Sequence, residues 1–222
     1  MADVAVTAAD DGTQFRHLVG EDVETSARMR CETDPALVPN ACACACACVV
    51  YNAFARRRVG EIVVTDHGYD AVTMGAERLA RRRGGRIPTA RVPLGADEDM
   101  AYEAVGAEMG EATDLIVVDQ VTSATALRPP LERIGAEALR RGVPMLADGA
   151  HAPGLLAAPL ADATFDLWTG NLHKWGCAPR GTPALVAHGP LRDLIHPLID
   201  SWGDQDPYPD RFAQQGTLDA TS

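Results

Sequence analysis

Short apolar runs alternate with amphipathic stretches from residue 36 onward in this chain of 222 residues. The apolar runs are rich in Val, Ile and Leu and predict these strands: Glu61–Thr65, Arg86–Val92, Leu115–Asp119, Val143–Asp148, Phe165–Thr169 and Pro183–Ala187. The stretches around them predict these helices: Ala41–Arg58, Tyr69–Arg83, Glu98–Gly110, Pro130–Arg141 and Pro190–Ile195. Strands that lead into helices indicate an α/β fold with a mainly parallel sheet between helices. In such sheets the chemistry lies beyond the carboxyl ends of the strands.

The chain divides into three parts by this pattern. Residues 1–35 are polar, acidic and weakly periodic, and we expect them to be partly disordered. Residues 36–200 carry the alternating pattern and form the predicted domain. Residues 201–222 are irregular, rich in Pro, Gly and Asp, and end without closing an element, which suggests a truncated chain.

Composition narrows the class of partner. Apolar residues make up 46% of the chain and charged residues 23%, which is ordinary for a globular protein. The formal net charge of −11 argues against a nucleic-acid partner. No stretch is long and apolar enough to span a membrane, and the N-terminus lacks the apolar core of a signal peptide. We therefore expect a cytoplasmic protein without a membrane partner.

Four of the six cysteines alternate with alanine in "ACACACAC", at Cys42, Cys44, Cys46 and Cys48. Neighbours this close are poor disulfide partners. The repeat resembles a thiolate cluster for a soft metal. It also fits a buried helix lined by small apolar side chains, because free Cys packs as a small hydrophobe. We favour the helix and expect no metal, since metal sites usually combine loops with longer ligand spacings.

The segment "NLHKW" contains Lys174, the only lysine of the chain, although Lys and Arg together number 20. Arginine stays protonated and cannot act as an amine nucleophile, whereas a desolvated lysine can lose its proton and form a Schiff base. A lone lysine among arginines is therefore a candidate reactive amine. Its retention by chance is the alternative.

Two predicted strand ends carry the remaining candidate chemistry. "LADGAHAPG" places Asp148 at the end of an apolar strand, with His151 three residues later. "LWTGNLHKWGCAPRG" places His173 and Lys174 after the next strand. An acid and a lone amine at neighbouring strand ends suit pyridoxal phosphate, since the lysine binds the aldehyde and the carboxylate keeps the pyridine nitrogen protonated. Taken alone, Asp148 would be a turn residue and His151 a core histidine.

Four segments in this order resemble class V aminotransferase-fold enzymes: "DQVTSATALRPPLERI", "DGAHAPG", "TGNLHKWGCAPRG" and "RFAQQGT". The likeness is greatest to the isopenicillin N epimerase-like branch, which is related to cysteine desulfurases. It runs from "ALVPNA" to the last residue. The resemblance implies the large domain of the fold-type I pyridoxal 5'-phosphate enzymes, with that cofactor bound at the sheet edge.

The resemblance also implies roles for individual residues. Lys174 would form the Schiff base with the cofactor, and Asp148 would pair with the pyridinium nitrogen. His151 would hydrogen-bond the phenolic oxygen of the cofactor. Thr122 and Ser123 lie in the strand-end segment that approaches the same oxygen.

The remaining expected contacts concern the cofactor's phosphate and ring. Asn171 and His173 would reach the phosphate. In "TDHGY", either His67 or Tyr69 would stack on the ring, and we favour Tyr69 slightly.

Gly216 and Thr217 match a "GT" pair that the family sends across a dimer interface to the partner's phosphate, which predicts a homodimer with shared active sites. The phosphate loop departs from the family. Where the family has Thr or Ser after Asn-Ala, this chain has Cys42 after Ala41. A thiol is a weak hydrogen-bond donor, so cofactor binding should weaken, although backbone amides from Ala41 onward could still serve.

The function implied is that of a pyridoxal phosphate enzyme acting at the α-carbon of an amino-acid-like substrate, as an epimerase or a carbon–sulfur lyase. Transamination ranks third. The family's N-terminal segment and its C-terminal small domain, which carries the substrate-clamping arginine, are not recognisable here. One alternative is therefore a catalytically impaired remnant that serves as a cofactor-binding or dimerisation module. A further alternative is a metal-binding module built on the cysteine repeat.

Overall fold

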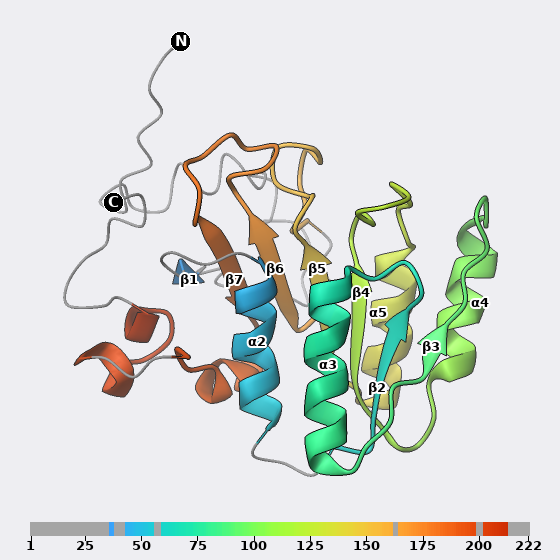
Figure 1. Ribbon diagram of the computed structural model, residues 1–222, viewed down its shortest axis with the longest axis horizontal. Coiled ribbons are helices and arrows are strands. Elements are labelled where there is room, and N and C mark those ends of the chain that lie inside the picture. Colours follow the sequence, from blue (N-terminus) through green and yellow to red (C-terminus); the bar gives the residue numbers. More distant parts are fainter. Residues whose placement is uncertain (1–35, 38–42, 56–58, 162–163, 199–201, 213–222) are drawn as a thin grey trace.

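The computed structural model describes residues 36–37, 43–55, 59–161, 164–198 and 202–212 (Figure 1). The strands are β1 (Ala36–Leu37), β2 (Glu61–Thr65), β3 (Thr89–Ala90), β4 (Thr113–Asp119), β5 (Met145–Gly149), β6 (Leu167–Asn171) and β7 (Pro183–Ala187). The α-helices are α2 (Ala43–Phe54), α3 (Asp70–Arg83), α4 (Glu98–Glu108) and α5 (Leu131–Arg141). Three 3-10 helices follow: η1 (Gly189–Leu194), η2 (Trp202–Gln205) and η3 (Asp210–Phe212).

The strands form one sheet in the order β1-β7-β6-β5-β4-β2-β3. Parallel pairing joins β3 to β2, β2 to β4, β4 to β5 and β5 to β6, whereas β7 runs antiparallel to both β6 and β1. This confirms the predicted mainly parallel sheet. Because β2, β4, β5 and β6 all point the same way, the loops that follow them meet at one edge (Figure 1).

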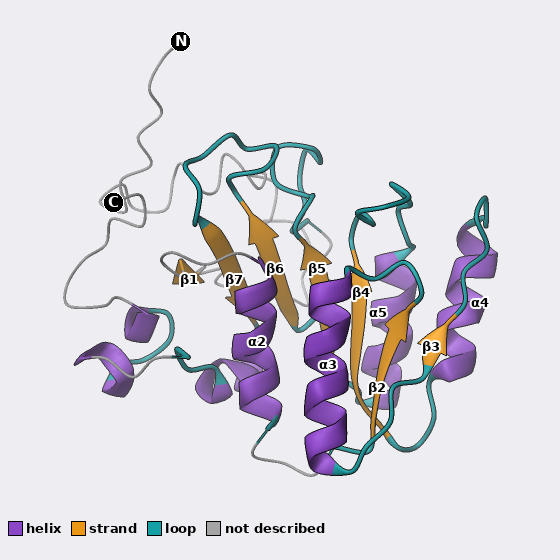
Figure 2. Ribbon diagram, viewed as in Figure 1, coloured by secondary structure: helices purple, strands orange, loops and turns teal. Residues whose placement is uncertain are grey.

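Helices cover both faces of the sheet, so each strand is buried on two sides (Figure 2). Ile62 and Val64 of β2 belong to a core with α2 and α3, while Val63 between them belongs to a second core with α4 and α5. Successive strand residues point to opposite faces, which is why these strands read as continuous apolar runs. Among the described residues, no helix is long and apolar enough to cross a membrane.

A tryptophan between two glycines packs the ends of β5 and β6. Trp168 is fully buried, and its indole N–H donates to Oε1 of Gln120 at 2.9 Å. A Cβ atom on Gly149 would stand 2.1 Å from the nearest indole atom, and one on Gly170 would stand 2.0 Å from it. Any larger residue would therefore displace the indole. This packing fixes the two strand ends that precede the candidate site.

Most predicted elements are confirmed within a few residues, and β2 and β7 have the predicted bounds. The Ala-Cys repeat is helical from Ala43, as expected. The prediction of a full strand over Arg86–Val92 was wrong: only Thr89–Ala90 pairs, because Pro88 and Pro93 supply no N–H to a ladder.

The prediction of an α-helix over Pro190–Ile195 was also wrong, since the segment forms η1, a 3-10 helix. It lies between Gly189 and the His196-Pro197 pair, where the residue before proline avoids the α region.

Candidate active site

Lys174 lies in the loop after β6, at the edge where the parallel strands end. Its Nζ is 2.9 Å from Nε2 of His151, in the loop after β5. The same Nζ stands 5.8 Å from the ring centroid of Tyr69, in the turn after β2. The structure thus brings together three of the residues that the sequence singled out, from three separate loops.

His151 faces two donors. The indole N–H of Trp175 donates to its Nδ1 at 3.2 Å, while Lys174 faces Nε2. Burial, and then the charge of Lys174, lower the pKa of His151, so the ring is held neutral. A neutral imidazole has one acceptor and one donor nitrogen, and an indole can only donate. The Trp175 contact therefore places the ring hydrogen on Nε2, the nitrogen on the Lys174 side.

Asp148 is 2% exposed, near the end of β5. Its Oδ1 accepts the backbone N–H of Ala150 at 3.0 Å, but its Oδ2 is buried without a hydrogen-bond partner among the described residues. Burial raises the pKa of Asp148, and the Ala150 N–H and Lys174 oppose that shift. An unpaired buried oxygen is costly. A protonated ring nitrogen would satisfy it, so the donor set here fits a pyridine cofactor.

Asp119 at the end of β4 is a second buried acid, which the sequence reasoning missed. It pairs in register with Asp148 across the parallel β4–β5 ladder. Burial, and then the neighbouring Asp148, raise its pKa to about 8. The signal was present, because "LIVVD" closes on an acid in the same way as the strand that carries Asp148.

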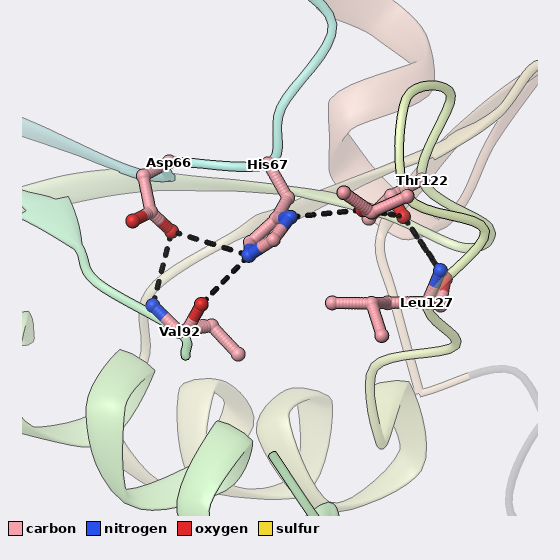
Figure 3. Close-up of polar contacts among 6 residues, drawn as sticks. Asp66, His67, Val92, Thr122 and Leu127 are labelled. Carbon is pink, nitrogen blue, oxygen red and sulfur yellow. Dashed lines mark hydrogen bonds and ion pairs between the residues drawn. The ribbon is translucent and has the colours of Figure 1, made fainter. Parts of the chain in front are cut away.

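His67, the other stacking candidate, is engaged elsewhere (Figure 3). Its Nδ1 lies 2.8 Å from Oγ1 of Thr125, and its Nε2 lies 2.7 Å from the carbonyl oxygen of Val92. Asp66 accepts the Val92 N–H at 3.0 Å. Both ring nitrogens of His67 are therefore occupied in linking the turn after β2 to neighbouring loops, whereas Tyr69 faces Lys174.

Thr122 continues this network. It is 2% exposed, its Oγ1 lies 2.8 Å from that of Thr125, and the same oxygen accepts the N–H of Leu127 at 2.7 Å (Figure 3). Ser123 beside it is exposed. His67 and Thr122 also line a cavity of about 280 Å³ that borders the start of α4. The network thus holds the turn after β4 in place and forms one wall of that cavity.

Asn171 joins the end of β6 to the start of α2, because its Oδ1 accepts the backbone N–H of Ala43 at 2.8 Å. Nearby, Nδ1 of His173 is buried without a partner among the described residues. Burial, and then the charges of Lys174 and Arg180, lower the pKa of His173. A helix start beside these side chains favours an anion.

Four expected cofactor contacts lie outside the described residues: Ala41, Cys42, Gly216 and Thr217.

The geometry of α2 bears on the cysteine repeat. Residues two apart on a helix are rotated by about 200°, so Cys46 and Cys48 lie on different faces. Cys46 is buried and Cys48 is partly exposed. Within the described ranges, no group of three or more His, Cys, Asp or Glu side chains could hold a metal ion. The described part of the repeat therefore lends no support to a thiolate cluster, although Cys42 lies outside it.

The family follows from a match to the model of "Aminotransferase class-V" over residues 37–202. This chain belongs to the class V aminotransferase family. Enzymes of this family depend on pyridoxal phosphate. The match confirms the resemblance seen in the four sequence segments.

Two curated relatives show which activities occur among similar proteins. An isopenicillin N epimerase from Streptomyces clavuligerus is 38% identical over 150 residues, covering 67% of this chain and 37% of the relative. A probable chloroplastic L-cysteine desulfhydrase from Arabidopsis thaliana is 28% identical over 187 residues, covering 77% and 39%. The chain therefore spans less than half the length of these relatives.

Solved structures confirm the predicted fold class. The cystine C–S lyase C-DES, in complex with cysteine persulfide, superposes with a TM-score of 0.71 at 22% identity, covering 84% of this chain and 52% of that one. The cysteine desulfurase CsdA from Escherichia coli gives a TM-score of 0.67 at 17% identity, covering 76% and 42%. A C-DES variant carries glycine covalently linked to its pyridoxal phosphate.

Proposed function

We propose that this chain is the cofactor-binding part of a pyridoxal phosphate enzyme that acts at the α-carbon of an amino-acid-like substrate, as an epimerase or a carbon–sulfur lyase. One observation carries the proposal: the only lysine of the chain stands at the strand edge that also carries the buried, unpartnered carboxyl oxygen of Asp148. The epimerase and desulfhydrase named among the relatives support both outcomes.

The residues around Lys174 would hold the cofactor ring. Lys174 supplies the amine for the covalent link, and Oδ2 of Asp148 receives the ring nitrogen's hydrogen. Tyr69 covers the ring, since its side chain faces Nζ, whereas both nitrogens of His67 are engaged. His151 presents its Nε2 hydrogen to the phenolic oxygen, held in that tautomer by Trp175. Thr122 and Ser123 are expected near the same oxygen.

Asn171, His173 and the start of α2 would hold the phosphate. The buried, unpartnered Nδ1 of His173 is a free hydrogen-bonding position. The carboxamide oxygen of Asn171 is fixed by Ala43, which leaves its NH₂ group to donate. Backbone N–H groups from Ala41 onward remain a proposed contribution, with Cys42 as the weak point.

Bound pyridoxal phosphate supplies an electron sink for the pair left on the α-carbon. Lys174 then has a second task, because its amine is the nearest base able to remove or return the α-proton. Return of the proton to the opposite face inverts the centre. Loss of a sulfur substituent from the β-carbon gives a lyase outcome. The described residues serve both reactions equally, so substrate contacts outside them decide between the two.

We also propose a homodimer in which Gly216 and Thr217 reach the partner's phosphate site. Large apolar side chains left exposed around Lys174 support a covering surface: Trp175 is 54% exposed and Tyr69 is 42% exposed. The cytoplasmic location remains a prediction from the sequence.

The test is an absorption spectrum of the purified chain with added pyridoxal phosphate, compared with Lys174→Ala. We expect a visible band that survives dialysis, becomes covalent on borohydride reduction and is absent in the variant. Because Lys174 is the only lysine, Arg83→Lys in the Lys174→Ala background provides a matched control for nonspecific labelling of an exposed amine. A dialysis-resistant band in this control would show that any lysine suffices. The absence of a band in the unmodified chain would favour the impaired remnant.

A further inference from the structure

Asp119 and Asp148 end neighbouring strands side by side. The register of the parallel ladder places Asp119 directly opposite Asp148. Residues opposite each other in a ladder project to the same face of a sheet. Asp119 is 5% exposed and Asp148 is 2% exposed, so two carboxyls share one dry face of the site.

Asp119 also faces the turn that carries Tyr69. A Cβ atom on Gly68 would stand 3.7 Å from Oδ2 of Asp119, and the backbone N–H of Tyr69 acts on the same carboxyl. Asp119 therefore lies between the ring-covering residue and the acid proposed for the ring nitrogen.

The charged and polar groups around this pair come from four loops. Lys174, after β6, is the cation that acts on both acids. Asp148 also accepts the Ala150 N–H, and the backbone N–H groups of Tyr69 and of Asp119 itself oppose the rise in the pKa of Asp119. One amine cannot balance two buried carboxylates, and like charges in one site keep one of them protonated. Burial and Asp148 accordingly raise the pKa of Asp119 to about 8.

We infer that Asp119 is a positioning residue, whose protonated carboxyl holds the Gly68–Tyr69 turn and leaves Asp148 as the single buried anion for the cofactor ring. The inference rests on the proposed function for its purpose. Its physical content, one shared proton and one held turn, concerns the chain without cofactor.

The first experiment measures the free energy of unfolding of the cofactor-free chain from pH 4 to pH 9. A carboxyl whose folded pKa lies above its unfolded value contributes stability that is complete below the unfolded pKa and is lost as pH rises through the folded one. For Asp119 the window runs from 3.8 to about 8. The unmodified chain should therefore lose stability across it.

Two variants at this position separate the charge from the contact. Asp119→Asn cannot titrate, and its amide oxygen can still accept from the turn. It should flatten the pH profile and be at least as stable as the unmodified chain at pH 8. Asp119→Ala also removes the titration but loses the turn, so it should be less stable than Asp119→Asn at every pH. An Asp119→Asn profile as steep as that of the unmodified chain would overturn the inference.

A second measurement needs no variant, in case neither folds. Infrared spectra of the unmodified chain labelled with ¹³C-aspartate should show a protonated carboxyl band at pH 6.5 that is lost as pH passes about 8. A chain with only carboxylate bands at pH 6.5 would contradict the shared proton.

With cofactor, Asp119→Ala should weaken pyridoxal phosphate binding by about tenfold, roughly the loss of one buried hydrogen bond, and Asp119→Asn by less. If the unmodified chain binds no cofactor, the proposed function fails while the pH profile still decides the role of Asp119.

Discussion

Tyr69 and His67 sit two residues apart in one turn, yet their environments differ. Tyr69 is 42% exposed and faces Lys174, whereas His67 is tied at both nitrogens to Thr125 and Val92. The sequence alone could not separate them, because both are aromatic and either could stack on a ring. The partners that distinguish them come from residues 25 and 58 positions away.

This difference predicts opposite phenotypes. Tyr69→Ala should weaken pyridoxal phosphate binding about tenfold or more, since stacking contributes on the order of 1–3 kcal/mol, with little change in unfolding. His67→Ala should lower the free energy of unfolding by about 1–3 kcal/mol, because buried partners lose their hydrogen bonds. Fluorescence titration and chemical denaturation measure the two effects. The reverse pattern would assign the ring to His67.

Asp148 predicts an exchange of stability for function. Because burial raises its pKa, its ionisation costs folded-state stability that is lost as pH rises above the unfolded value. Asp148→Asn should therefore raise the unfolding midpoint of the cofactor-free chain at pH 8 while weakening cofactor binding. Equal stability at pH 8, together with unimpaired binding, would remove Asp148 from the site.

At the scale of elements, the apolar strands were predictable because β2, β4, β5 and β6 are buried on both faces. The reversal of β7 was not, because a buried strand has the same composition in either direction. The early end of β3 was readable from its prolines, Pro88 and Pro93. Site residues at strand ends were found for the same reason as the strands. Asp119 was missed because its meaning depends on its register with Asp148, which no spacing along the chain reveals.

The packing of β5 against β6 gives an element-scale prediction. Gly149→Ala and Gly170→Ala would each force a methyl group into the indole of Trp168, and each should lower the free energy of unfolding by about 1–3 kcal/mol. Gly106→Ala, on α4, meets nothing within 4 Å and should stabilise by about 0.5–1 kcal/mol. Urea denaturation would compare the three. Loss of stability in Gly106→Ala but not in the other two would refute the packing account.

At the scale of the whole molecule, the site is a shelf formed by one edge of the sheet. The chain covers 37% of the epimerase relative, so whatever covers that shelf lies beyond what this sheet supplies. If a second copy covers it, sedimentation velocity with pyridoxal phosphate should give the mass of two chains. Thr217→Ala should then weaken cofactor binding without changing the unfolding of the separate chain. A single-chain mass at saturating cofactor would contradict the homodimer.

The central claim is that Lys174 binds pyridoxal phosphate covalently. The most direct measurement is peptide mass spectrometry after borohydride reduction of the loaded chain. We predict one modified peptide, carrying the added phosphopyridoxyl group on Lys174 within "NLHKW". Unmodified Lys174 at saturating cofactor, or modification confined to the N-terminal amine, would contradict the account.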